Sequence, residues 1–129
     1  MTTERLFVAI AALLGGTAVA AGAFATHALR AQLSDRLLTI FETGARYQMY
    51  HALALLLVAL VLAQGLGASG LLTVAGWAFV GGTAVFSGSL YALALTGQNL
   101  LGAVAPVGGA LLMLGWGCLA VAALVGVGE

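Results

Sequence analysis

The 129-residue chain is 63% hydrophobic and only 6% charged, and its mean hydropathy is +1.15. Soluble domains carry about 25% charged residues, so the composition excludes an ordinary soluble domain and predicts an integral membrane protein. Net charge is zero and lysine is absent, which excludes a nucleic-acid partner. The single cysteine, Cys118, excludes an intrachain disulfide, and zinc-ligand spacings are absent.

The first predicted span covers residues 6–29, which is long enough for a hydrocarbon core of about 30 Å. A cleaved signal peptide is the rival interpretation, but the apolar run is too long for such a segment. Small residues recur at steps of three and four along this span, a pattern that favours close helix packing. They are Ala12, Gly16, Ala20 and Ala23, with His27 at the end. We expect this small-residue stripe, and therefore His27, to face the interior of the bundle.

An amphipathic interfacial helix is predicted over about residues 34–46, between spans one and two. Ser34 is a suitable N-cap, and Asp35 follows in the first turn, where a negative charge suits the helix dipole. Glu42 and Arg46 are four residues apart in the favourable order for an ion pair. Gly44 either separates this helix from span two or lies within one long helix, and the sequence leaves both open.

Three further spans are predicted at about residues 47–64, 71–95 and 100–127, with short turns between them. Pro106 removes a backbone donor, so we expect a kink or a late helix start in span four. Small-residue stripes are expected to mediate packing in the last two spans. They comprise Gly81, Ala84, Gly88 and Ala92 in span three, and Gly108, Gly115, Cys118 and Ala122 in span four.

These elements predict a single domain, residues 1–129, folded as an all-α four-transmembrane-helix bundle. Four spans place both termini on one side of the membrane. Three arginines in residues 30–46, against Arg5 near the start, favour a cytoplasmic location for the 30–46 segment. That count is weak evidence of orientation, because Asp35 and Glu42 are placed to neutralise part of this charge.

Four ordered motifs resemble a known family. They are GAFATHAL at 22–29, YQMYHALALL at 47–56, FSGSLYALALTG at 86–97, and APVGG with LGW at 105–109 and 114–116. The chain resembles the YgdD family of small membrane proteins, domain of unknown function 423, which includes animal transmembrane protein 256. The resemblance covers nearly the whole chain and implies four membrane helices, but no activity. Bacterial members often end in a basic tail that suggests cytoplasmic termini, whereas this chain ends at Glu129, so its orientation stays open.

The candidate site is the set of polar residues around the start of span two. Because His27 and His51 are expected at the same interface, we predict that they share one pocket. A bis-histidine haem or metal site is the sharper interpretation, but no other ligand spacing supports it, so no cofactor and no metal site is expected. The candidate polar or ligand-binding residues are His27, Glu42, Arg46, Tyr47, Gln48 and His51, with Ser87 and Tyr91 from span three.

These residues admit two functions. The favoured one is a structural or binding protein of the bacterial inner membrane, such as an accessory subunit, whose partners are the lipid bilayer and itself or another membrane protein. The polar residues would then tie the interfacial helix to the bundle. The alternative is a small carrier or enzyme that handles a lipid- or quinone-like ligand at a Glu42–His51 site. No nucleophile or oxyanion arrangement accompanies that pair, so an enzyme is not favoured and no catalytic residue is assigned.

Overall fold

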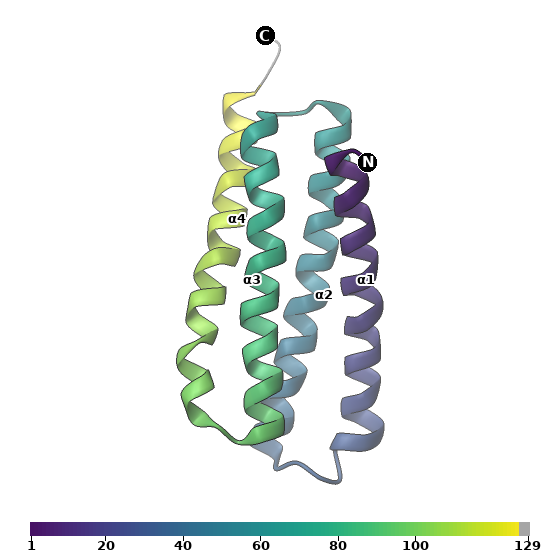
Figure 1. Cartoon of the computed structure of the whole chain (residues 1–129), viewed down its shortest axis with the longest axis vertical. Coiled ribbons are helices and arrows are strands. Elements are labelled where there is room, and N and C mark those ends of the chain that lie inside the picture. Colours follow the sequence, from purple (N-terminus) through teal and green to yellow (C-terminus); the bar gives the residue numbers. More distant parts are fainter. Residues whose placement is uncertain (127–129) are drawn as a thin grey trace.

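The computed structural model describes residues 1–126, and these residues form an up-and-down array of four long helices (Figure 1). A π-helical turn, η1, extends the first helix, and a 3-10 segment, η2, precedes the last. The bounds are α1 (Thr3–Phe24), η1 (Ala25–Leu29), α2 (Asp35–Gln64), α3 (Ser69–Thr96), η2 (Asn99–Ala103) and α4 (Ala105–Val125). The predicted all-α, four-span architecture is confirmed.

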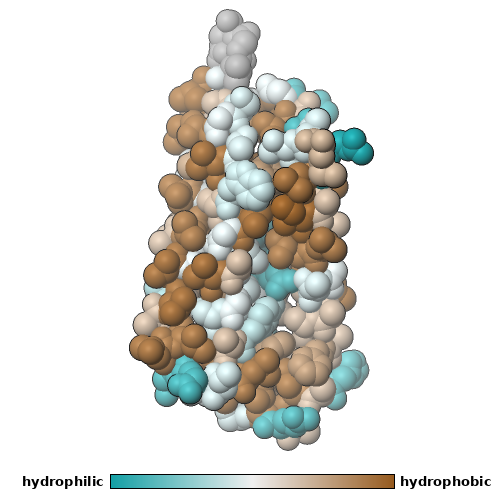
Figure 2. Space-filling model, viewed as in Figure 1, coloured by the Kyte–Doolittle hydropathy of each residue, from teal (hydrophilic) through white to brown (hydrophobic). Residues whose placement is uncertain are grey.

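Each of the four helical segments is long and apolar enough to cross a bilayer; with η1 and η2 included, they contain 27, 30, 28 and 27 residues. At 1.5 Å per residue, the shortest is about 40 Å long, which exceeds the hydrocarbon core of a bilayer. Figure 2 shows hydrophobic and weakly polar side chains over most of the visible surface, with strongly hydrophilic ones mainly near the two ends and a small hydrophilic patch at mid-height. The surface therefore matches a belt of lipid around the middle of the molecule.

The helices lie in the order α4, α3, α2, α1 across the molecule, so that chain neighbours are also neighbours in space (Figure 1). Contacts are extensive between α1 and α2, between α2 and α3, and between α3 and α4, whereas α1 meets α3 over a small area. That small area centres on Phe7, which is fully buried and fills the space beside Gly76. The chain therefore has two central helices, α2 and α3, flanked by α1 and α4.

The predicted interfacial helix is not a separate element, because residues 35–46 are the first turns of α2. Ser34 is the N-cap as predicted, and its hydroxyl accepts a hydrogen bond from the amide of Leu37 at 3.2 Å. Of the two possibilities left open for Gly44, the long helix is the correct one. Gly44 is buried, and a Cβ there would lie 2.9 Å from the ring of Tyr91. This glycine therefore permits close packing of α3 and does not end the helix.

The small-residue stripe predicted to mediate packing is confirmed for α4, and the one predicted for α1 is wrong. Gly108 and Gly115 are buried against Phe86 and Phe79 of α3, where a Cβ at either position would overlap the neighbour. Along α1 and η1 the predicted stripe is exposed throughout, from Ala12 and Gly16 in α1 to His27 in η1. A different row of α1 and η1 packs on the bundle, namely Phe7, Ala11, Ala18 and Ala25. Apart from Phe7 and His27, both rows consist of alanine and glycine, so the sequence pattern did not distinguish them.

The other predicted stripe, in α3, is also misplaced. Ala84 and Gly88 are exposed, and Gly81 and Ala92 are half-buried. The close contacts of α3 are made instead by Gly76 and Gly82, which neighbour Phe7 of α1 and Leu112 of α4.

Helix α4 starts late, as Pro106 predicted. The chain forms η2 first and enters α4 at Ala105, with Pro106 in the first turn, where its missing amide costs no intrahelical hydrogen bond. The last described helical residue is Val125. The predicted end of span four at residue 127 lies outside the described residues.

Candidate functional site

The predicted polar residues of α2 fall on three different faces of the helix, not in one site. Glu42 and Arg46 lie toward α1, Gln48 and Gly44 lie toward the interior, and Tyr47 and His51 lie toward α4. Glu42 and His51 are separated by about two and a half helical turns, which places them on opposite sides of α2. The expected Glu42–His51 pair therefore does not form.

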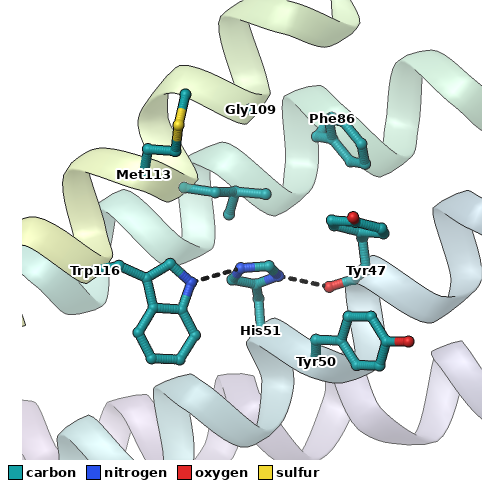
Figure 3. Close-up of a pocket in the computed structure, with 8 residues that line it drawn as sticks. Tyr47, Tyr50, His51, Phe86, Gly109, Met113 and Trp116 are labelled. Atoms are coloured by element: carbon teal, nitrogen blue, oxygen red, sulfur yellow. Dashed lines mark hydrogen bonds between the residues drawn. The ribbon is translucent and has the colours of Figure 1, made fainter.

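His51 is the polar centre of the face toward α4. Its side chain is buried, although α2 there faces a lateral opening of the bundle. Nδ1 lies 2.8 Å from the carbonyl oxygen of Tyr47, one turn earlier in α2. Nε2 accepts a hydrogen bond of 3.1 Å from the indole Nε1–H of Trp116 in α4 (Figure 3). This second bond ties α2 to α4 across the site.

These two contacts assign the protonation state of His51. An indole N–H only donates, so Nε2 must accept and carries no proton. The ring proton then resides on Nδ1 and is donated to the Tyr47 carbonyl oxygen. His51 is therefore a neutral imidazole with both nitrogens engaged, and neither is free to ligate a haem iron while the Trp116 bond persists.

A cavity of about 550 Å³ lies beside His51, between α2 and α4, and α3 contributes to its wall. Such a volume is within the range of about 300–1,000 Å³ typical of small-molecule sites. Its walls are almost entirely apolar and rich in aromatic rings (Figure 3). The lining comprises Tyr47, Tyr50, His51, Phe86, Gly109, Leu112, Met113 and Trp116.

The rings around this cavity are in contact with one another. The Tyr47 ring lies 5.0 Å from that of Phe86 and 6.2 Å from that of His51, nearly parallel to the imidazole. Trp116 meets Phe79 edge-to-face at 5.0 Å. Such contacts hold aromatic side chains in defined orientations, so the wall is preformed. Trp116 and Met113 are 45% and 69% exposed, so the cavity opens sideways toward lipid.

Gln48 forms a separate interior network that joins three helices. Its amide nitrogen donates to the carbonyl oxygen of Leu14 at 2.9 Å and to the hydroxyl of Thr17 at 2.7 Å, both in α1. Its amide oxygen accepts from the hydroxyl of Tyr91 in α3 at 2.7 Å. Nearby, the buried Ser87 hydroxyl donates to the carbonyl oxygen of Gly44 at 2.7 Å. Gln48, Ser87 and Tyr91, three of the candidate site residues, thus use their polar atoms in hydrogen bonds between helices.

Glu42 and Arg46 line a second cavity, of about 330 Å³, between α1 and α2. The predicted ion pair between them is wrong: within the described part of the chain neither forms a salt bridge. Arg46 instead donates to the Thr43 hydroxyl at 3.1 Å. Because helical side chains tilt toward the N-terminus, Arg46 extends back toward the start of α2 and the membrane surface, as membrane arginines commonly do.

His27 does not join His51. It is exposed in the π-helical turn η1. The residue of α1 that lies at the same depth as His51 of α2 is close to Gly15. A Cβ on Gly15 would lie 3.9 Å from the Cβ of Ala52, the residue after His51. His27 follows Gly15 by twelve residues, or about 18 Å along the helix axis. The predicted shared pocket is therefore wrong, and the two histidines cannot ligate one metal.

Sequence reasoning missed Trp116, Phe86 and Met113 as lining residues, and Thr17 as a partner of Gln48. Trp116 lies in the LGW motif at 114–116, but the sequence alone did not pair it with a histidine 65 positions away. One signal in the sequence could have indicated the pair: a tryptophan deep in a span needs a hydrogen-bond acceptor for its indole N–H. Among residues 1–126, no group of three His, Cys, Asp or Glu side chains is arranged to hold a metal ion.

The fold and this geometry define a multi-pass helical membrane protein with a lateral, aromatic-lined cavity beside a neutral histidine. The comparisons agree with that class. Residues 21–109 match the family described as "Protein of unknown function (DUF423)". Because this match covers more than half of the chain, the protein belongs to the DUF423 family, which confirms the resemblance of its motifs.

Several bacterial membrane proteins are similar to this chain over most of their length. The UPF0382 membrane protein YwdK of Bacillus subtilis is 41% identical over 120 residues, covering 93% of this chain and 97% of the relative. A UPF0382 membrane protein of Staphylococcus epidermidis is 42% identical over 124 residues, covering 93% and 96%. One from Staphylococcus aureus is 40% identical over 122 residues, covering 92% and 94%. No solved structure matches the chain.

Proposed function

We propose that this protein binds a lipid-soluble molecule with a flat, conjugated head group, such as a quinone, in the cavity between α2 and α4. The observation that carries the proposal is the hydrogen bond between buried His51 and half-exposed Trp116, in the wall of an aromatic-lined cavity that opens toward lipid. A partly buried polar bridge inside an apolar, laterally open site is suited to a ligand that diffuses within the bilayer.

The residues of the cavity supply the interactions that a quinone ring needs. Tyr47, Phe86 and Trp116 offer ring faces and edges for stacking. The phenol hydroxyls of Tyr47 and Tyr50 make no hydrogen bond within residues 1–126, and a phenol O–H donates readily to a carbonyl oxygen. Met113 is exposed at the cavity, and its flexible thioether adapts to an apolar tail.

His51 and Trp116 act as positioning residues in this proposal. Their mutual hydrogen bond holds the indole ring in place and links α2 to α4 before the ligand arrives. A preformed wall lowers the ordering cost of binding. The site offers stacking and hydrogen bonds, so the proposed activity is binding.

The two tryptophans of the chain provide a direct test. The Trp77→Phe variant keeps Trp116 as the sole indole fluorophore, whereas Trp116→Phe keeps Trp77, which packs on Phe7 away from the cavity. Each variant is titrated in detergent micelles with a decyl-tailed benzoquinone, which quenches indole emission. We expect Trp116 emission to fall along a saturating curve and Trp77 emission to fall linearly with the mole fraction of quinone.

A matched pair of glycine variants separates site binding from collisional quenching. Gly109 lines the cavity, whereas Gly117, also in α4, has nothing within 4 Å of an added Cβ. In the Trp77→Phe background, Gly109→Leu should abolish the saturating component and Gly117→Leu should retain it. Linear quenching of Trp116 at all quinone mole fractions would refute the proposal.

A second candidate function is that of an accessory subunit in a membrane assembly. It is supported by the exposed small-residue stripe of α1, which includes Ala12, Gly16 and Ala20, because small residues let another membrane helix approach closely. Purification from native membranes in mild detergent separates the two candidates. A stoichiometric protein partner favours the accessory role, and a retained quinone favours the binding role.

The proposed location is the bacterial inner membrane. The relatives described above are bacterial membrane proteins. Proteins of the bacterial outer membrane span it as β-barrels, whereas the spans of this chain are helical. Helical spans and bacterial relatives together support the inner membrane.

A further inference from the structure

The second cavity, between α1 and α2, is a separate polar site on the opposite side of α2 from His51. Its volume is about 330 Å³. Small residues of α1 leave the space open, and α2 contributes two side chains of opposite charge. The lining comprises Ala18, Val19, Gly22, Thr26, Glu42, Ala45, Arg46 and Met49.

The two charges of this cavity do not neutralise each other. Glu42 is half-buried, and Arg46 is exposed and bonded to Thr43. Glu42 makes no hydrogen bond or salt bridge within residues 1–126. A half-buried carboxylate beside lipid is costly unless it is paired, so the cavity leaves a carboxylate and a guanidinium available to a ligand that carries both charges.

The depth of the cavity matches the boundary between lipid head groups and hydrocarbon. Helix α2 has 30 residues, or about 45 Å, close to the full thickness of a bilayer with its head groups. Glu42 lies about 10 Å and Arg46 about 16 Å along the axis from the first residue of α2. Because Arg46 extends back toward Thr43, its guanidinium lies closer to the level of Glu42 than its Cα does.

We infer that this cavity binds the head group of phosphatidylethanolamine, with the lipid phosphate on Arg46 and the primary ammonium on Glu42. Guanidinium and phosphate form strong charge-assisted hydrogen bonds, as do ammonium and carboxylate. If the lipid phosphate pairs with Arg46 and the lipid ammonium with Glu42, the two protein charges can lie in one cavity without pairing with each other. The lipid tails would extend along the neighbouring apolar groove between α1 and α2, which shares Met49 with this cavity and is also lined by Val8 and Leu53.

The pair of charges also predicts selectivity among lipids. Phosphatidylcholine carries a quaternary ammonium, which has no N–H to donate to Glu42. Phosphatidylglycerol has no ammonium, so Glu42 would lie unpaired beside an anionic lipid. The expected order of affinity is therefore phosphatidylethanolamine, then phosphatidylcholine, then phosphatidylglycerol.

The test is lipid retention by the full chain. The protein is placed in nanodiscs with equal amounts of the three lipids and released, and the retained lipids are counted by native mass spectrometry. We expect wild type to retain phosphatidylethanolamine preferentially. Glu42→Gln should reduce its ratio to phosphatidylglycerol by about tenfold or more, as expected for a lost charged hydrogen bond. Arg36→Gln, which removes an arginine outside the cavity that bonds to Asn99, should leave the ratio unchanged.

A steric variant keeps the inference testable even if Glu42→Gln perturbs folding. Gly22 has nothing within 4 Å of an added Cβ, so Gly22→Leu should fit in the fold and fill the cavity, abolishing the preference. The equally open Gly16→Leu, outside the cavity on the same helix, should preserve it. Equal retention of the three lipids by wild type, or an undiminished preference in both Glu42→Gln and Gly22→Leu, would overturn the inference.

Soluble glycerophosphoethanolamine distinguishes a lipid from a free solute. The head group alone lacks tails that bury apolar surface beside Met49, so it should not displace retained phosphatidylethanolamine. Displacement by the soluble compound at micromolar concentration would overturn the assignment to a membrane lipid.

Discussion

Replacing Gln48 by Leu tests the interior network that joins α1, α2 and α3. The change removes hydrogen bonds to the Leu14 carbonyl oxygen, the Thr17 hydroxyl and the Tyr91 hydroxyl while keeping a side chain of similar size. Hydrogen bonds between membrane helices contribute about 0.6 kcal/mol on average and about 1.7 kcal/mol at most. Three such bonds give an expected loss of about 2 kcal/mol, with an upper bound of about 5 kcal/mol.

A double-mutant cycle isolates one of these bonds. Tyr91→Phe removes only the hydroxyl that donates to Gln48. The coupling free energy between Gln48→Leu and Tyr91→Phe should lie between about 0.6 and 1.7 kcal/mol. Unfolding is followed by circular dichroism in mixed micelles as dodecyl sulfate is added. Tyr50→Phe, at a half-exposed tyrosine outside the network, is the matched control and should show no coupling with Gln48→Leu.

The result that would refute this reasoning is a coupling energy of zero within error for Gln48 and Tyr91. The hydrogen bond would then contribute nothing to stability, and the network would not hold the three helices together. A large destabilisation by Tyr50→Phe would likewise show that loss of any tyrosine hydroxyl, and not the network, decides the outcome.

Two further predictions concern helix packing. Gly108→Ala should destabilise the protein by about 1–3 kcal/mol, because the added Cβ would overlap the backbone of Phe86. Unfolding in mixed micelles measures this loss of stability. An unchanged stability would contradict the close contact between α3 and α4. Cysteines at His27 and His51 in a Cys118→Ser background should fail to form a disulfide under mild oxidation, because they lie at different depths. Cysteines at Gly15 and Ala52 should form one, because their Cβ atoms would lie 3.9 Å apart. Efficient crosslinking of the histidine pair would contradict the placement of α1.

The polar residues of α2 show what sequence reasoning could and could not resolve. Local chemistry predicted Ser34 as the N-cap and the late start of α4 at Pro106, and both are confirmed. The hydrogen bond between Gln48 and Tyr91 was not predicted, although both residues were in the candidate site. The Glu42–His51 site was wrong because nearness in sequence was taken as nearness on one helix face. Nine residues bring a helix to its opposite side, so these residues line different cavities.

By itself, the sequence determined that this chain is a four-span helical membrane protein, because apolar length and the cost of unsatisfied backbone groups in lipid leave few alternatives. It also located the polar residues. The tertiary structure decided which face of each helix packs inward, since in lipid both faces of α1 are apolar and the small residues Gly16 and Ala18 lie on different sides. It alone paired His51 with Trp116 across the cavity, because that contact depends on how α2 and α4 flank α3.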